Sequence, residues 1–136
     1  MKLKNYVLMN EDFIKLLGEF TSYKIKPTVA FTLLKLVKEM NVEKQNIDES
    51  RNALIKKHGT EKDGSFSIDK DDKEVIETFM KEYNEILKLD FELSITDKID
   101  IECDKIFSLD KNSGKWESVY LTIGEVSLLS EIFNFV

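Results

Sequence analysis

Hydrophobic and polar positions change their period along this chain, and the changes divide it into predicted elements. Over residues 27–58, apolar side chains recur every three or four residues, and neither Gly nor a further Pro interrupts them. Pro27 suits a first helical turn, where its missing N–H is no loss, and Gly59 suits a left-handed helix end. The pattern predicts one helix over residues 27–58, roughly 45 Å long.

The apolar stripe of this helix changes halfway along. In the first half every stripe position is apolar, and Phe31, Leu34 and Leu36 add apolar side chains on flanking faces. In the second half Lys44 and Arg51 replace apolar residues and leave a thin seam. We expect the first half to be covered on more than one side and the second half to meet a single partner.

That partner is predicted to be the next helix. Residues 59–68 hold the turn signal Asp63-Gly64, and residues 69–88 return to a helical period, so an antiparallel helical hairpin is expected. Acidic residues of the second helix should form ion pairs with Lys44 and Arg51 beside the seam. These acids are Glu74, Glu77, Glu82 and Glu85.

The remaining elements lie at the two ends of the chain. Asn10 is predicted to cap a short helix near the N-terminus. Beyond residue 88 the period falls to 2, which predicts half-buried strands over residues 89–95, 99–103 and 116–121. A capping box at 122–125 then opens a short amphipathic helix. We expect one small antiparallel sheet, covered by the first half of the long helix and the two terminal helices.

Together these elements predict an α+β fold in one domain over residues 1–136. Residues 1–88 are mainly helical and form the antiparallel helical hairpin with its long central helix. Residues 89–136 form the small antiparallel sheet and the short C-terminal helix. Of the 136 residues 42% are hydrophobic, including nine Phe, which is enough for one core.

Charge is spread unevenly between the two parts of the chain. Residues 1–58 carry 11 Lys and Arg against 7 Asp and Glu, a net +4, whereas residues 59–136 carry 9 against 19, a net −10. The acidic part repels phosphates, so direct nucleic-acid binding is not expected. Cys103 is the single cysteine, which excludes an intrachain disulfide, and its strand position predicts a small buried hydrophobe. No membrane-spanning run or secretory signal is present, so we expect a cytosolic protein.

Candidate chemistry is sparse, and we predict no catalytic, cofactor-binding or metal-binding residue. His58 is interpreted as a cation at the negative end of the long helix. Residues 110–114 partly match a calcium loop, but Gly114 and Leu121 occupy ligand positions, so a plain turn is favoured. The acids before the second hairpin helix are interpreted as its first turn rather than as a cation site: Asp69, Asp71 and Asp72.

Two groups of residues are candidates for binding a partner. Phe133 and Phe135 either fold into the core or form an exposed apolar end that docks on another protein. Asp100, Glu102 and Asp104 belong to an acidic stretch that is either a solvated face or a substitute for nucleic-acid phosphates.

A family resemblance adds to this picture. The order of elements and three segments resemble small uncharacterised proteins encoded by tailed bacteriophages and prophages of low-GC Gram-positive hosts. The segments are Lys57-His58-Gly59-Thr-Glu-Lys-Asp63-Gly64, Phe79-Met-Lys-Glu-Tyr83-Asn-Glu85 and Ile101-Glu-Cys103-Asp-Lys105. The resemblance implies a gene among late structural genes near those for the tail, with no assigned reaction and no cofactor.

These observations lead to three hypotheses of different classes. The first is a non-enzymatic phage protein that acts through protein contacts as a tail-region structural or assembly component. It would be located in the cytoplasm of the infected host or in the virion, and its oppositely charged parts would allow homo-oligomers. The second is a small acidic inhibitor of a host defence enzyme, acting by nucleic-acid charge mimicry. The third is a hydrolase with paired carboxylates, which requires a concave pocket holding them.

Overall fold

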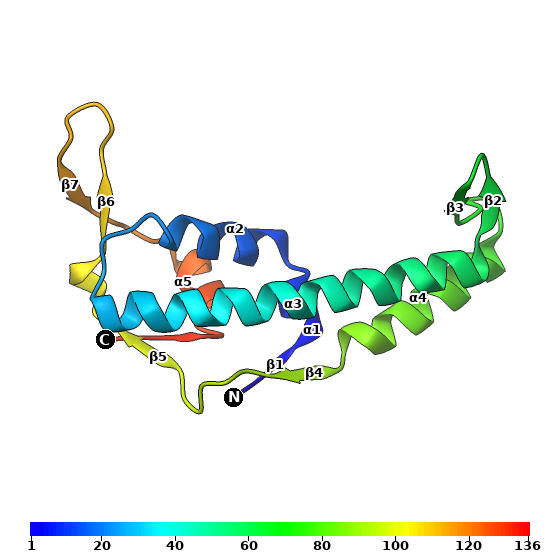
Figure 1. Ribbon diagram of the computed structural model, residues 1–136, viewed down its shortest axis with the longest axis horizontal. Coiled ribbons are helices and arrows are strands. Elements are labelled where there is room, and N and C mark those ends of the chain that lie inside the picture. The colour runs from blue at the N-terminus through cyan, green and yellow to red at the C-terminus, as the bar shows by residue number, and fades with distance from the viewer.

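The computed structural model describes residues 1–136 and shows an elongated α+β protein, as the sequence predicts. Helix α3, Pro27–His58, runs along most of its length (Figure 1). The N-terminal and C-terminal elements lie against one side of the first half of α3, and a helical hairpin occupies the other end. The predicted long helix is confirmed over its whole length.

The end of α3 differs in detail from the expectation. Gly59 has φ −87° and an extended backbone, so it is not a left-handed helix end. Its N–H donates to the carbonyl oxygen of Ile55 at 2.7 Å. A Cβ at this position would lie 2.4 Å from the Ile55 oxygen and 2.7 Å from the Ser67 oxygen. Glycine is therefore required by the close approach of two backbones rather than by a positive φ.

The helical hairpin is confirmed. Helix α4, Lys73–Leu87, runs antiparallel to α3, and Asp72 caps it by accepting a hydrogen bond from the backbone N–H of Val75 at 3.2 Å. Between the two helices, strands β2 (Thr60–Lys62) and β3 (Ser65–Ser67) form a small hairpin. Its two turn residues both have positive φ, 52° at Asp63 and 81° at Gly64, as an Asp-Gly hairpin turn requires.

The predicted ion pairs across the hairpin are wrong in position. Lys44 and Arg51 form no ion pair, whereas Glu82 contacts Lys57 at 3.3 Å and His58 at 2.8 Å. The helical phase explains the difference, because only Glu82 among the four acids flanks the buried Phe79 and is partly covered. The other three face solvent: Glu74, Glu77 and Glu85.

The strands do not form the single antiparallel sheet that the sequence suggests. Strand β1 (Lys2–Lys4) pairs antiparallel with β4 (Asp90–Glu92), and β5 (Ile99–Ile101) pairs parallel with β8 (Phe133–Phe135). Strands β6 (Phe107–Leu109) and β7 (Trp116–Ser118) form a third, antiparallel pair. Each of these strands is three residues long. The segments predicted as strands over 89–95 and 99–103 pair with strands near the two chain ends and not with each other.

One hydrophobic core joins the terminal elements to α3. It includes side chains of α1 (Asn5–Leu8), α2 (Glu11–Phe20) and α5 (Ile123–Leu129). Asn10 caps α2, and Thr122 and Glu125 form the predicted capping box of α5. Helix α3 contributes Leu33, Leu36, Met40 and Ile47 to this core.

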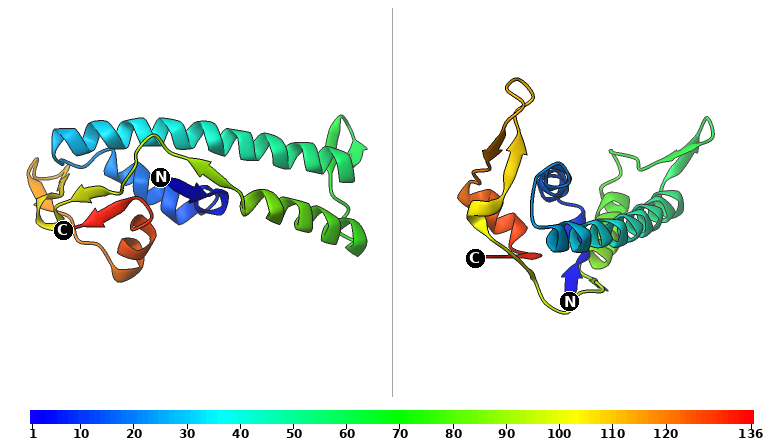
Figure 2. Two further views of the ribbon diagram at one scale, coloured as in Figure 1. Left: turned by 90° about the horizontal axis from the view of Figure 1, so that it is seen from below. Right: turned by 60° about the vertical axis from the view of Figure 1, so that its left-hand side comes forward.

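One expectation for the first half of α3 is wrong. Leu36 is fully buried, but Phe31 is 67% exposed and Leu34 is 50% exposed. All of the body lies on one side of α3, so residues on its far side have no cover (Figure 2). An outward face of α3 that carries apolar side chains is thus open to solvent.

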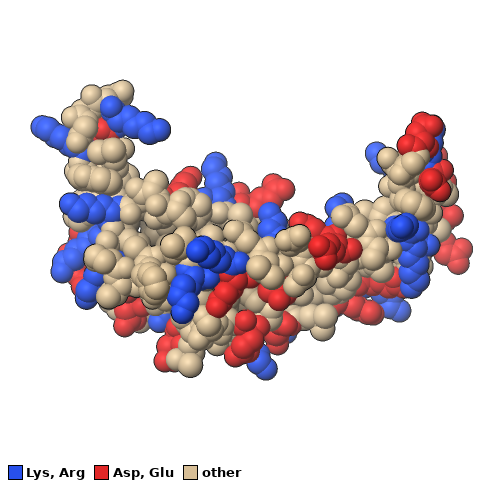
Figure 3. All heavy atoms as spheres, viewed as in Figure 1, with Lys and Arg blue, Asp and Glu red and all other residues tan.

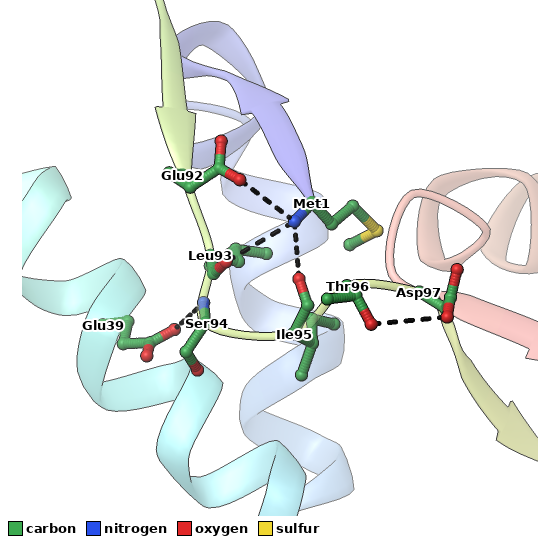
Figure 4. A network of polar contacts seen from close by, with 8 residues as sticks. All are labelled: Met1, Glu39, Glu92, Leu93, Ser94, Ile95, Thr96 and Asp97. Atoms are coloured by element: carbon green, nitrogen blue, oxygen red, sulfur yellow. Dashed lines mark hydrogen bonds and ion pairs between the residues drawn. The ribbon is translucent and has the colours of Figure 1, made fainter.

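The segment between β4 and β5 is tied to both α3 and the N-terminal strand (Figure 4). Glu39 of α3 accepts a hydrogen bond from the backbone N–H of Ser94 at 3.2 Å. The amino group of Met1 donates to the carbonyl oxygen of Ile95 at 2.5 Å and lies 3.4 Å from Glu92 Oε1. These contacts fix where β5 begins relative to the long helix.

Candidate protein-interaction surface

A projecting β-hairpin at one end of the molecule is the most distinctive surface feature. We call residues 107–123 the arm; it consists of β6, β7, the connection to α5 and the first residue of α5, and its hairpin extends away from the body (Figures 1 and 2). The base of the arm is fixed by a two-way backbone contact. The N–H of Lys24 donates to the Phe107 oxygen at 2.7 Å, and the N–H of Phe107 donates to the Lys24 oxygen at 3.1 Å.

The tip of the arm is an ordered turn. The backbone N–H of Asn112 donates to Asp110 Oδ1 at 2.9 Å, and Ser113 Oγ donates to Asp110 Oδ2 at 3.1 Å. These hydrogen bonds, the one from Asn112 foremost, lower the pKa of Asp110 below its ordinary value. Gly114 has φ 68°, which favours glycine. Both oxygens of the Asp110 carboxylate are used within the turn, which supports the interpretation of this segment as a turn.

Four large apolar side chains of the arm are open to solvent. Tyr120 is 90% exposed and Ile123 is 91% exposed, while Leu109 and Trp116, a cross-strand pair in the hairpin, are nearly half exposed. Lys24 Nζ lies 5.8 Å from the centre of the Trp116 ring, within cation–π range. We call these four residues the arm surface: Leu109, Trp116, Tyr120 and Ile123.

Sequence reasoning missed the arm surface, although a signal was present. In the strand predicted over residues 116–121, both faces are apolar, with Trp116 and Tyr120 on one and Val119 and Leu121 on the other. Only Val119 and Leu121 pack against the core. A two-stranded hairpin can bury one face at most, so the second apolar face had to remain exposed.

The acidic residues predicted to bind a partner lie together at the end of β5 and the short turn after it. Asp100, Glu102 and Asp104 are all exposed. Asp100 Oδ1 accepts a hydrogen bond from Asn134 Nδ2 at 2.7 Å, and Glu102 pairs with Lys105. The hydrogen bond to Glu102 raises the pKa of Lys105 above its ordinary value. Two of these three carboxylates therefore already have partners within the molecule.

The aromatic residues near the C-terminus belong to the core. Phe133 is 1% exposed and stacks on Phe20 with ring centroids 5.2 Å apart. Phe135 is half-buried and packs against the same cluster. The core interpretation of the two alternatives is the one that fits, because a side chain covered by Phe20 cannot contact another protein.

Cys103 is exposed, so the prediction that it is buried is wrong. Strand β5 ends at Ile101, and Cys103 begins a 3-10 turn, Cys103–Lys105, in which its side chain is exposed. The 3-10 turn ends the alternation of period 2, and the next core residue after Ile101 is Ile106.

A cavity of about 680 Å³ opens between the start of α3 and the end of β5. Three Lys residues line it, but two are already engaged, Lys105 with the Glu102 carboxylate and Lys24 with the Trp116 ring. Its carboxylates, Asp100 and Glu102, contact Asn134 and Lys105 respectively. Nowhere in residues 1–136 do three or more His, Cys, Asp or Glu side chains gather as a metal site would need.

The polar residues of the other end have structural contacts. His58 lies in the last turn of α3, as interpreted from the sequence, and faces Glu82. Asp72 caps α4, and Asp69 Oδ1 accepts a hydrogen bond from the N–H of Asp71 at 3.0 Å. The interpretation of these acids as a helix start is confirmed only for Asp72, because α4 begins at Lys73 and Asp69 and Asp71 lie in the turn before it.

No protein-family model, curated protein or solved structure matches this chain. None of the helices is both long enough and apolar enough to span a bilayer. The shape and exposed side chains of the molecule therefore carry the functional argument.

Proposed function

We propose that this chain is a non-enzymatic protein of a tailed bacteriophage, and that it acts through protein contacts as a structural or assembly component of the tail region. The observation that carries the proposed mode of action is the arm surface: Leu109 and Trp116 are nearly half exposed on the projecting hairpin, and Tyr120 and Ile123, on the connection from the hairpin to α5, are about nine-tenths exposed. The resemblance of three sequence segments to phage proteins supports the proposed setting.

The physical basis is the free energy released when such side chains leave water. Fully burying an Ile-sized side chain contributes roughly 1.5–3 kcal/mol, and aromatic residues such as Tyr and Trp are frequent at the centres of interfaces. The tip of the arm is ordered by Asp110, and its base is held by Lys24, so little conformational entropy is lost on binding. A rigid projection with apolar side chains is suited to fit a recess in a partner.

The mimicry hypothesis receives less support from the geometry. Six carboxylates would substitute for phosphates under this hypothesis: Asp90, Glu92, Asp97, Asp100, Glu102 and Asp104. Three of them face cations, because Asp90 contacts Lys4 at 2.9 Å, Glu92 contacts the Met1 amino group and Glu102 contacts Lys105. Asp100 faces the Asn134 amide. Carboxylates that are paired with cations attract a basic groove weakly, so we do not propose mimicry as a second function.

Affinity purification from cells producing the phage tests the proposal. Tagged protein should recover tail components identified by mass spectrometry, and the double variant Tyr120→Ser, Ile123→Ser should reduce that recovery at least about tenfold, the loss of more than about 1.4 kcal/mol. Leu89→Ser is the matched control, because Leu89 is also an exposed apolar residue but lies outside the arm. Recovery of one host enzyme in place of tail components, or equal recovery with the arm variant, would overturn the proposal.

A further inference from the structure

The outward face of α3 carries a pattern that none of its contacts explains. Seven residues spaced three or four apart are all exposed, and at 3.6 residues per turn they lie within an arc of about 80° opposite Leu33, Met40 and Ile47. We call them the outer stripe: Phe31, Lys35, Lys38, Val42, Asn46, Glu49 and Ala53.

The outer stripe is complementary to itself when reversed about Val42. Lys35 and Glu49 are each seven residues from Val42, on opposite sides of it. Phe31 and Ala53 are each eleven residues away, which pairs a large apolar side chain with a small one. An antiparallel second copy centred on Val42 would therefore bring Lys35 against Glu49 of the second copy, twice by symmetry, and Val42 against Val42.

We propose that the outer stripe is an antiparallel interface with a second copy of this chain. Charge complementarity selects this occupant and this direction. A parallel second copy would set Lys35 against Lys35 and Glu49 against Glu49, and like charges in contact oppose association. The antiparallel arrangement turns both contacts into opposite-charge pairs and places the exposed Val42 on the twofold axis.

The shape of the molecule leaves this face accessible. Helix α3 forms one outer side, and the rest of the chain lies behind it (Figure 2). The two β-hairpins extend sideways from its ends rather than across its outward face, which Figure 3 shows from the front. A second α3 can therefore lie against the first along the middle of the helix, at the distance of 8–10 Å usual for packed helices.

The composition of the stripe sets the strength of the interface. Val42 and Phe31 are its only large apolar residues, with Leu34 at its edge, so the pair belongs to the small, weak class of protein interfaces. The dimer should be reversible and sensitive to salt, since exposed ion pairs are screened by salt. The arm is not involved, so the interface is independent of the partner proposed for the arm.

A charge exchange gives the decisive test, read by sedimentation equilibrium across the micromolar to millimolar range at low salt. Lys35→Glu and Glu49→Lys should each weaken dimerisation by about tenfold or more, because each variant creates two like-charge contacts. The double variant Lys35→Glu, Glu49→Lys should restore the dimer to nearly its original affinity. Lys70→Glu, which makes the same charge change on the loop before α4, is the control and should leave affinity unchanged.

Crosslinking gives the direction of pairing independently. In a Cys103→Ser background, Val42→Cys should form a disulfide-linked dimer under mild oxidation, because the two side chains meet on the axis. Lys35→Cys alone should stay monomeric, whereas a mixture of Lys35→Cys and Glu49→Cys chains should crosslink. A monomer at every concentration, equal affinities for the single and double charge variants, or crosslinking of Lys35→Cys to itself would overturn the proposal. The arm variant Tyr120→Ser, Ile123→Ser should still dimerise, so failure of the stripe and failure of the arm are distinguishable.

Discussion

His58 Nε2 lies 2.8 Å from Glu82 Oε2, so the last turn of α3 is joined to α4 across the helical hairpin. Lys57 Nζ approaches the other carboxylate oxygen at 3.3 Å. The hydrogen bond from His58, with a further contribution from Lys57, lowers the pKa of Glu82 below its ordinary value of 4.5. One carboxylate thus receives two donors from consecutive residues of α3.

Glu82→Gln should make stability less dependent on acid pH. A carboxylate whose pKa is lower in the folded protein stabilises the fold above its unfolded pKa, near 4.5, and the contribution disappears as pH falls through the folded pKa. The melting temperature of the variant should be lower than that of the native protein at pH 7, and the difference should close towards pH 3. Glu85→Gln, on the exposed face of α4, is the control, and an equal pH profile for the two variants would contradict the role of His58.

Alanine at two glycines should have opposite effects. Gly59→Ala places a Cβ against the Ile55 and Ser67 carbonyl oxygens, so the backbones must separate, and we expect a loss of more than about 1 kcal/mol of unfolding free energy. Gly18→Ala lies within α2 with no atom near the new Cβ, so the helix should gain roughly 0.5–1 kcal/mol. Urea denaturation measures both. A stable Gly59→Ala variant would show that the β2–β3 hairpin can shift away from α3.

Phe133→Ala should remove a central part of the core. The ring is fully buried and stacks on Phe20, so its loss should cost about 3–5 kcal/mol of unfolding free energy. Ile123→Ala, at an exposed site on α5, should change stability by less than about 0.5 kcal/mol. Denaturant midpoints compare the two. Similar midpoints would mean that β8 is not a fixed part of the core.

Thr122→Ala should weaken the start of α5. Thr122 Oγ1 accepts a hydrogen bond from the backbone N–H of Glu125 at 3.1 Å, and Glu125 Oε1 accepts one from the N–H of Thr122 at 2.9 Å. Losing the hydroxyl should cost about 1 kcal/mol. Ser127→Ala, on the exposed face of the same helix, removes a hydroxyl without a cap and serves as the comparison in thermal melts.

The helices of this protein follow from local signals in the sequence. Pro27, the Asn10 cap and the capping box at Thr122 act within a turn of the residues that they affect, so each marks its helix start correctly. The Asp63-Gly64 turn is also local, because both residues must adopt positive φ to close the hairpin. Short-range chemistry of this kind is readable in the order of residues.

The strand pairings depend on distant contacts that periodicity does not encode. Leu3 pairs with Phe91, and Ile99 pairs with Phe133 in a parallel ladder. An alternation of apolar residues predicts that a segment is half-buried but not which other segment lies beside it. For the same reason the burial of Phe133 was predicted only as one of two alternatives. The prediction that Cys103 is buried was wrong.

Candidate surface residues were the hardest to predict. An apolar side chain such as Tyr120 or Phe31 is exposed only because no other element reaches it. That depends on the whole arrangement of the chain, in particular on every element of the body lying on one side of α3. Charged residues such as Asp100 and Glu102 were predicted to be exposed, but their partners, Asn134 and Lys105, became visible only in the fold.

The parallel ladder between β5 and β8 has a consequence for how the protein is made. The helical hairpin needs only neighbouring residues and can form on the ribosome as soon as α4 has emerged. The body cannot close until β8 has been synthesised, because Phe133 fills the space against Phe20 and its strand alone pairs with β5. Translation that stops shortly before residue 133 should therefore leave a finished hairpin beside an open, protease-sensitive body.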